Sequence, residues 1–117
     1  MIECYRLVVF IPKDNLDQFI KAIQDAIPSF IGNYDRVMWW NDPNIEYGTG
    51  QFRPLEGANP TEGIIGETER IEDIRIEFLV PHDTEKIDEM IETTIRPAHP
   101  FEEPVIYVTK AELFENK

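Results

Sequence analysis

The sequence has little thiol or imidazole chemistry, with one cysteine, Cys4, and two histidines among its 117 residues. A single thiol forms neither an internal disulfide bond nor a cysteine-rich zinc site. With only two imidazole groups, the sequence does not single out a histidine pair, a Ser–His–Asp set or a Cys–His set. The sequence therefore does not indicate the usual nucleophile–base hydrolase designs.

Basic residues are also scarce, since 11 Lys and Arg stand against 23 Asp and Glu, for a formal charge of -12. A nucleic-acid partner needs a basic surface, and so does an anionic membrane, so neither partner is expected. The longest early apolar run, 7–11, is too short for a signal peptide or a membrane span. We therefore expect a cytoplasmic protein. The acid pairs Glu72–Asp73 and Asp88–Glu89 are expected to be solvated surface.

Hydrophobic residues make up 42% of the chain, which is ordinary for a globular protein. A chain of this length buries roughly two thirds of its unfolded surface. We expect one domain over residues 1–117.

Five segments have the β-branched and aromatic content typical of strands. The expected strands are 4–11, 37–40, 45–51, 71–80 and 105–109. In the fourth segment apolar and charged side chains alternate, which predicts a half-buried strand.

Apolar residues recur at helical spacing in two segments between these strands. The first helix is expected over 16–27 and is ended by Pro28. The second is capped by Asp83 or Thr84 and halted by Pro97. Two strand–helix–strand halves predict an α+β fold, the ferredoxin-like sandwich (βαββαβ), with both helices on one face of an antiparallel sheet. The segment 52–66 is expected to form an extra hairpin arm.

Two helices of this kind leave the other face of the sheet uncovered. Trp39 and Trp40 are adjacent, so in a strand they point to opposite faces, one into the core and one outward. An exposed sheet face with large aromatic side chains predicts a homo-oligomer. The alternative is a monomer whose own arm covers the face.

The glycine-rich segment 48–60 is a candidate ligand loop. Gly48 and Gly50 allow a ligand to approach the backbone, and Arg53 can bind an anion. The spacing matches neither a dinucleotide-binding nor a Walker motif. The alternative is a kinked hairpin whose arginine pairs locally.

The proline-framed segment 99–104 is the second candidate. Its frame would hold His99, Glu102 and Glu103 together, which suits a divalent metal or acid–base chemistry. The spacing is not that of a known metal motif. The alternative is that the prolines route the chain into the last strand, while His99 caps it and the glutamates face water.

Four motifs, in this order, resemble the CutA-like (PII-like) domain inserted in the NIF-three-like family, also called GTP cyclohydrolase I type 2 homologues. They are Y-R-L-V-V-F-I-P, I-G-N-Y-D, G-T-G-Q-F-R-P-L-E-G-A-N-P and H-P-F-E-E-P-V-I-Y-V. The resemblance covers residues 4–113, so the chain looks like a free-standing version of the insert. It departs from the family pattern at 39–40, 42–46 and 95–97.

The resemblance implies a ferredoxin-like sandwich whose sheets associate, commonly as trimers, with a dimer as the alternative. The dinuclear metal site of the family belongs to domains flanking the insert, so its hydrolase activity is not carried over. The leading hypothesis is a non-catalytic oligomeric module that binds a small ligand or metal ion, or regulates an unknown protein partner, at clefts between subunits. The candidate residues are Gly48, Gly50, Arg53, Asn59, His99, Glu102 and Glu103.

Two alternatives stay open. One is an interface enzyme, a metal-dependent hydrolase with His99 as base and Glu102 or Glu103 as acid or metal ligand. The other is CutA-like binding of a divalent metal, for which His99, Glu102 and Glu103 are the candidate ligands.

Overall fold

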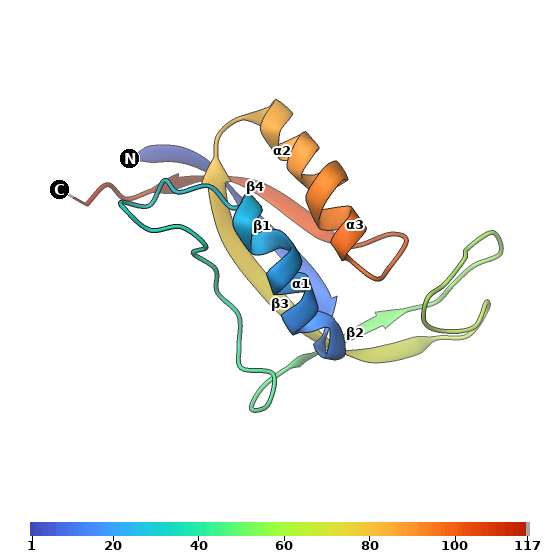
Figure 1. The fold of residues 1–117 in the computed structure, drawn as a ribbon. Coiled ribbons are helices and arrows are strands. Elements are labelled where there is room, and N and C mark those ends of the chain that lie inside the picture. Colours follow the sequence, from blue (N-terminus) through green and yellow to red (C-terminus); the bar gives the residue numbers. More distant parts are fainter. Residues whose placement is uncertain (117) are drawn as a thin grey trace.

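Four strands form one antiparallel sheet in the computed structural model, which describes residues 1–116 (Figure 1). They are β1 (Ile2–Pro12), β2 (Gly48–Phe52), β3 (Glu69–Pro81) and β4 (Ile106–Leu113). The order across the sheet is β2-β3-β1-β4, so the two long strands are central. The expected α+β class with an antiparallel sheet is confirmed.

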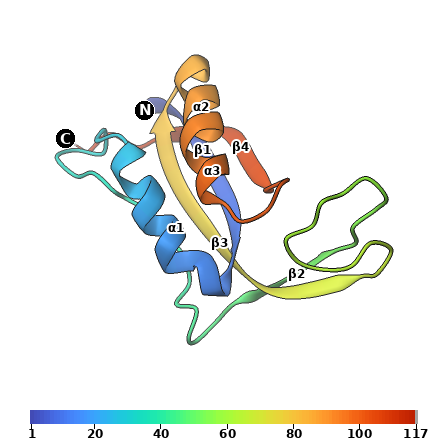
Figure 2. The ribbon, with the colours of Figure 1, turned by 45° about the vertical axis from the view of Figure 1, so that its right-hand side comes forward.

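Helical segments follow β1 and β3, and both lie on the same face of the sheet (Figure 2). The first is α1 (Leu16–Ile23), which is shorter than the expected helix because the chain tightens to a 3₁₀ turn over Gln24–Ala26. The second begins with α2 (Thr84–Met90), where the Asp83 carboxylate accepts a hydrogen bond from the Lys86 N–H. Asp83 therefore caps this helix, as one of the two sequence alternatives has it.

The second helical segment changes its winding before it ends. A π-helical turn, Ile91–Ile95, follows α2, and a final short turn, α3 (Arg96–Ala98), contains Pro97. Proline lacks the N–H that a regular α-helix uses, which accounts for the irregular turn just before it. After Ala98 the chain becomes extended at His99.

The core lies between the sheet and its helices. In the register of β1 and β3, Leu7 pairs with Phe78 and Val9 with Ile76, and all four side chains are buried. From the helices, Phe19, Ile23, Ile87 and Ile95 complete this core. The alternation expected in β3 is present, with apolar residues inward and Arg75 and Glu77 on the opposite face.

The sheet face opposite the helices is not covered by any other helix of the described chain (Figures 1 and 2). Trp40 packs against the core, whereas Trp39 is 55% exposed. The two neighbouring tryptophans thus lie in different environments, as expected from the sequence.

The prediction of a strand at 37–40 is wrong. Only Trp39 pairs with β3, through two backbone hydrogen bonds of 2.9 Å with Glu77. A turn follows at once, in which the Asp42 carboxylate accepts a bond from the Asn44 N–H. This turn diverts the chain before a ladder can form. The strand expected at 45–51 forms as β2, three residues later than expected at its start.

Between β2 and β3 the residues 53–68 form an arm that projects beyond the body of the sheet (Figure 2). No helix within residues 1–116 is long and apolar enough to cross a membrane.

Candidate functional site

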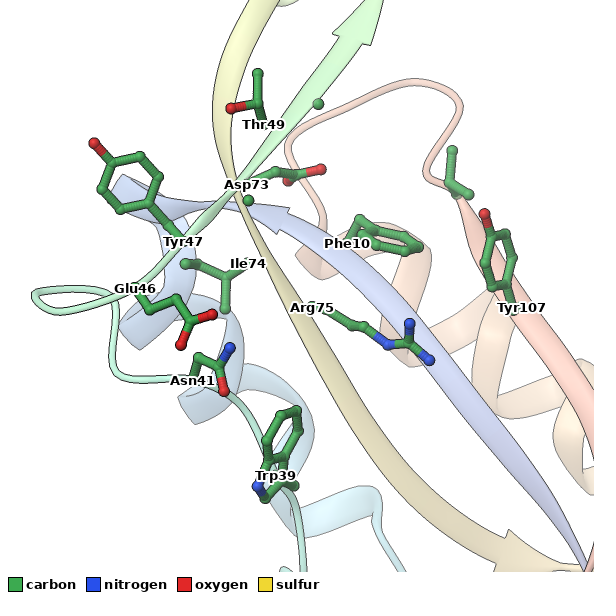
Figure 3. A pocket seen from close by; sticks show the side chains of 13 residues that line it. Phe10, Trp39, Asn41, Glu46, Tyr47, Thr49, Asp73, Ile74, Arg75 and Tyr107 are labelled. Carbon is green, nitrogen blue, oxygen red and sulfur yellow. The ribbon is translucent and has the colours of Figure 1, made fainter.

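A cavity of about 510 Å³ opens on the side of the sheet away from the helices (Figure 3). Trp39, Glu46 and Tyr47 line it from the segment before β2, and Phe10 and Tyr107 line it from β1 and β4. Figure 3 shows the two groups of side chains on opposite sides of β3. The uncovered sheet face is therefore hollowed and aromatic.

A second cavity, of about 250 Å³, lies between the arm and residues 99–104, the turn that leads into β4. Phe52 lines it from the end of β2 and Arg53 from the start of the arm, and Phe101, Glu102 and Glu103 line it from the turn. The two segments singled out in the sequence, 48–60 and 99–104, thus face one another across this cavity.

Direct contacts hold the arm against the turn. The Asn59 backbone N–H donates to Glu102 Oε1 at 2.9 Å, and Thr61 Oγ1 donates to the Pro100 carbonyl at 2.7 Å. The Phe52 and Phe101 rings lie 5.9 Å apart between centroids. Asn59 therefore joins the site through its backbone, and its side chain is not among the groups that line either cavity.

His99 lies behind the second cavity rather than in it. Its side chain is buried, and Nδ1 accepts a hydrogen bond of 3.1 Å from the Phe101 N–H. Nε2 therefore carries the proton and donates to the Phe10 carbonyl at 2.6 Å. Burial lowers the pKa of His99, and the hydrogen bond to Phe10 opposes this in part. Both ring nitrogens are occupied in joining β1 to the turn.

The candidate metal ligands are not placed together. Glu102 and Glu103 line the second cavity, but His99 does not. Within residues 1–116, no group of three or more His, Cys, Asp or Glu side chains is arranged to hold a metal ion.

The two candidate glycines, Gly48 and Gly50, lie where the cavities meet β2. Gly48 lines the first cavity and Gly50 lines both. A side chain at Gly50 would place its Cβ 2.8 Å from Asp73 Oδ2, so glycine leaves room for this carboxylate.

Asp73 is a site residue that the sequence analysis missed, because the acid pair Glu72–Asp73 was expected to be solvated surface. It lines both cavities and is only partly exposed. Burial raises the pKa of Asp73, and a smaller effect from a backbone hydrogen bond at Ile74 lowers it. The available signal was the alternation of β3, which places Asp73 on the same face as Arg75 and Glu77.

Comparison with known proteins identifies relatives for most of the chain. No family model matches it. Proteins described as GTP cyclohydrolase 1 type 2 homolog are 37% identical over 100 residues in Halalkalibacterium halodurans and 34% identical over 100 residues in Bacillus subtilis. These matches cover 86% and 84% of this chain but only 25% and 24% of the relatives.

Among solved structures, the crystal structure of a Bacillus cereus protein related to NIF3 superposes with a TM-score of 0.71 at 31% identity. The match covers 96% of this chain and 26% of that one. The family resemblance carried by the four sequence motifs is thus confirmed. The chain is a relative of the GTP cyclohydrolase 1 type 2 homologs and NIF3-related proteins, and it spans about a quarter of their length.

Proposed function

We propose that the chain is a single non-catalytic, self-associating module that binds a small ligand where the arm meets the turn. Its copies associate through the uncovered sheet face. A trimer is the favoured assembly, and a dimer is the alternative. The strand order β2-β3-β1-β4, with both helical segments on one face, supports the CutA-like form of the ferredoxin-like sandwich.

The observation that carries self-association is the aromatic character of the uncovered face. Trp39, Tyr47 and Tyr107 are 55%, 46% and 51% exposed, and all three line the same cavity. Fully burying one large apolar side chain is worth on the order of 2–3 kcal/mol. A few such side chains therefore supply enough free energy to hold copies together.

The observation that carries ligand binding is the cavity between the arm and the turn. Its walls come from segments about 40 residues apart in the chain, and they are held by the Asn59–Glu102 and Thr61–Pro100 hydrogen bonds. Apolar walls with a few convergent polar groups are typical of small-molecule sites. In this cavity the Phe52 and Phe101 rings supply the apolar surface, and Arg53 and Glu103 supply charge.

Binding without catalysis is favoured over the interface enzyme. A general base needs a free nitrogen in the site, and both nitrogens of His99 are engaged with backbone groups. Binding of a divalent metal by His99, Glu102 and Glu103 would need His99 to leave those partners. The name of the relatives describes proteins of which this chain covers about a quarter, so their activity does not carry over to it.

Self-association is tested by measuring molar mass in solution over a wide range of concentration, by light scattering and sedimentation. We expect a trimer or dimer for the natural chain and a shift to monomer for Tyr107→Lys. Val108→Lys is the matched control. Val108 is the next residue along β4 and is 40% exposed, but it pairs with the core residue Leu7, so its side chain lies on the helix-covered face of the sheet. A natural chain that is monomeric at every concentration contradicts the proposal.

A further inference from the structure

The two cavities join into one groove. Four residues line both of them, namely Phe10, Gly50, Asp73 and Val105. Figure 3 shows Asp73 at the crossing of β2 and β3, with its carboxylate on the side of Phe10. Of these four residues only Asp73 is charged, so the junction carries a carboxylate.

Two basic side chains near Asp73, Arg75 and Lys13, are paired with other acids, whereas Arg53 lines the second cavity without an ion pair among the described residues. Arg75 donates from Nε and Nη2 to Glu77 Oε1, at 3.0 and 2.6 Å. Lys13 lies 3.6 Å from a Glu72 carboxylate oxygen. Within residues 1–116, no ion pair involves Asp73, although the side chain is only partly exposed.

Aromatic rings line the first cavity together with this carboxylate. The Phe10 and Tyr107 rings meet edge to face at 5.3 Å, and Trp39 lines the same cavity from the other side. Tyr47 also lines it there, but Lys13 Nζ already lies 4.8 Å from the centroid of its ring. The face of an aromatic ring attracts a cation, and this attraction grows when the cation is partly desolvated. Glu46 adds a second negative charge to the lining.

We propose that the joined groove binds a planar organic cation, such as an amidinium or guanidinium group carried on an apolar ring, with Asp73 as its counter-charge. This inference rests on the proposed function and adds the chemical class of the ligand. The rings proposed to hold copies together also line the groove, so the ligand binds where copies meet. A planar amidinium donates two parallel N–H groups to one carboxylate. Its ring then lies among the aromatic side chains, which a hydrated metal ion would not use.

Gly50 belongs to the same recognition. Its missing side chain lets the Asp73 carboxylate stand over β2, since a Cβ would lie 2.8 Å from Oδ2. The glycine thus keeps the carboxylate at the junction, where both cavities reach it.

The test uses three ring compounds of similar shape and different charge: benzamidinium, neutral benzamide and anionic benzoate. Binding to the natural chain is measured by calorimetry, and the site is located from backbone amide shifts in NMR spectra. We expect benzamidinium to bind at least about tenfold more tightly than benzamide, because hydrogen bonds between charged groups are stronger than those of a neutral amide. Its shifts should fall on Phe10, Asp73 and Tyr107.

Two variants assign the preference to one side chain. Asp73→Asn keeps the shape and removes the charge, so the preference for benzamidinium should disappear. Glu72→Gln is the control, because it removes a neighbouring acid that pairs with Lys13 and lines neither cavity. This control should keep the preference.

Each other outcome overturns the inference in a recognisable way. If benzamide or benzoate binds in the groove as tightly as benzamidinium, the ligand site stands and its assignment to cations fails. If none of the three binds in the groove, the ligand site fails together with the inference. If Asp73→Asn binds benzamidinium unchanged, or the shifts lie outside the groove, Asp73 is not the counter-charge.

Discussion

Asp73 and His99 are titratable side chains that folding partly removes from water. They differ in the hydrogen bonds that offset this loss of hydration. His99 has a hydrogen-bond partner at each ring nitrogen. Asp73 has no ion pair among the described residues, and a backbone hydrogen bond at Ile74 offsets its burial only in part. A buried group with partners stabilises the native state, and a charged one without them costs stability.

We predict that Asp73→Asn stabilises the unliganded protein. The native state raises the pKa of Asp73 above the ordinary value of 3.8, so its ionised form at neutral pH is disfavoured by folding. The amide removes this cost, and we expect a gain below about 1 kcal/mol because the group is partly solvated. Thermal unfolding measures the gain, which should vanish below about pH 3.8, where the acid is protonated in both states.

His99 predicts a loss of stability on mild acidification. Its native pKa lies below the ordinary 6.5, so the unfolded chain binds the proton more readily. The contribution of His99 is therefore complete above about pH 6.5 and is lost as the pH falls toward the native pKa. The free energy of unfolding, from urea titrations at about pH 7.5 and about pH 5.5, should drop more for the natural chain than for His99→Gln.

The same comparison contains its control. His99→Gln should be less stable at both pH values, by about 1–3 kcal/mol, because it leaves one buried group without its partner. Contributions from other titrating groups are common to both proteins and cancel. Equal pH dependence in the two proteins would show that His99 is not buried in its neutral form.

At the scale of elements, the arm is attached to the turn by very few bonds. Thr61→Val removes the hydroxyl that donates to the Pro100 carbonyl and keeps the shape of the side chain. We predict faster proteolysis and faster amide exchange across residues 53–68, with little change in the melting temperature, because the arm lies outside the core.

Thr68→Val is the control for this prediction, since Thr68 lies at the other end of the arm and is exposed. It should leave the cleavage rate of the arm unchanged. If both variants are cleaved equally fast, the bond to Pro100 does not hold the arm.

The periodic spacing of apolar residues predicted the strands and helices whose own sequence carries a clear pattern. The strands β1 and β3 and the helical segments formed close to their expected limits, because each carries a clear apolar pattern. The strand at 37–40 failed because a strand also needs a partner over several residues. Its chain leaves β3 after Trp39, at the turn held by Asp42.

The site was predicted only as two segments, 48–60 and 99–104. That they face one another depends on bonds between residues about 40 apart, such as Thr61 with Pro100. The role of His99 depends on Phe10, which is 89 residues away in the sequence. No local pattern encodes such distances, so neither feature could be read from the sequence. Asp73 was missed for a related reason, since its surroundings come from four separate segments.

At the scale of the whole molecule, charge opposes the proposed association. Each copy carries a formal charge of -12, so copies repel one another at long range. Salt screens this repulsion and leaves the burial of aromatic side chains intact. We predict that the association constant, from sedimentation, rises as sodium chloride is increased.

A charge-neutral osmolyte such as glycerol controls for solvent effects unrelated to screening. If association weakens with salt instead, ion pairs rather than apolar burial hold the copies together. The aromatic face would then not be the interface.

The burial of Cys4 gives the central strand a chemical reporter of its own. Cys4 is buried, and its sulfur lies 3.5 Å from the Ala111 carbonyl of β4. Burial also raises the pKa of this thiol, which suppresses the reactive thiolate. An alkylating reagent therefore reacts slowly with the native protein, and the labelling rate reports how often the structure around Cys4 opens.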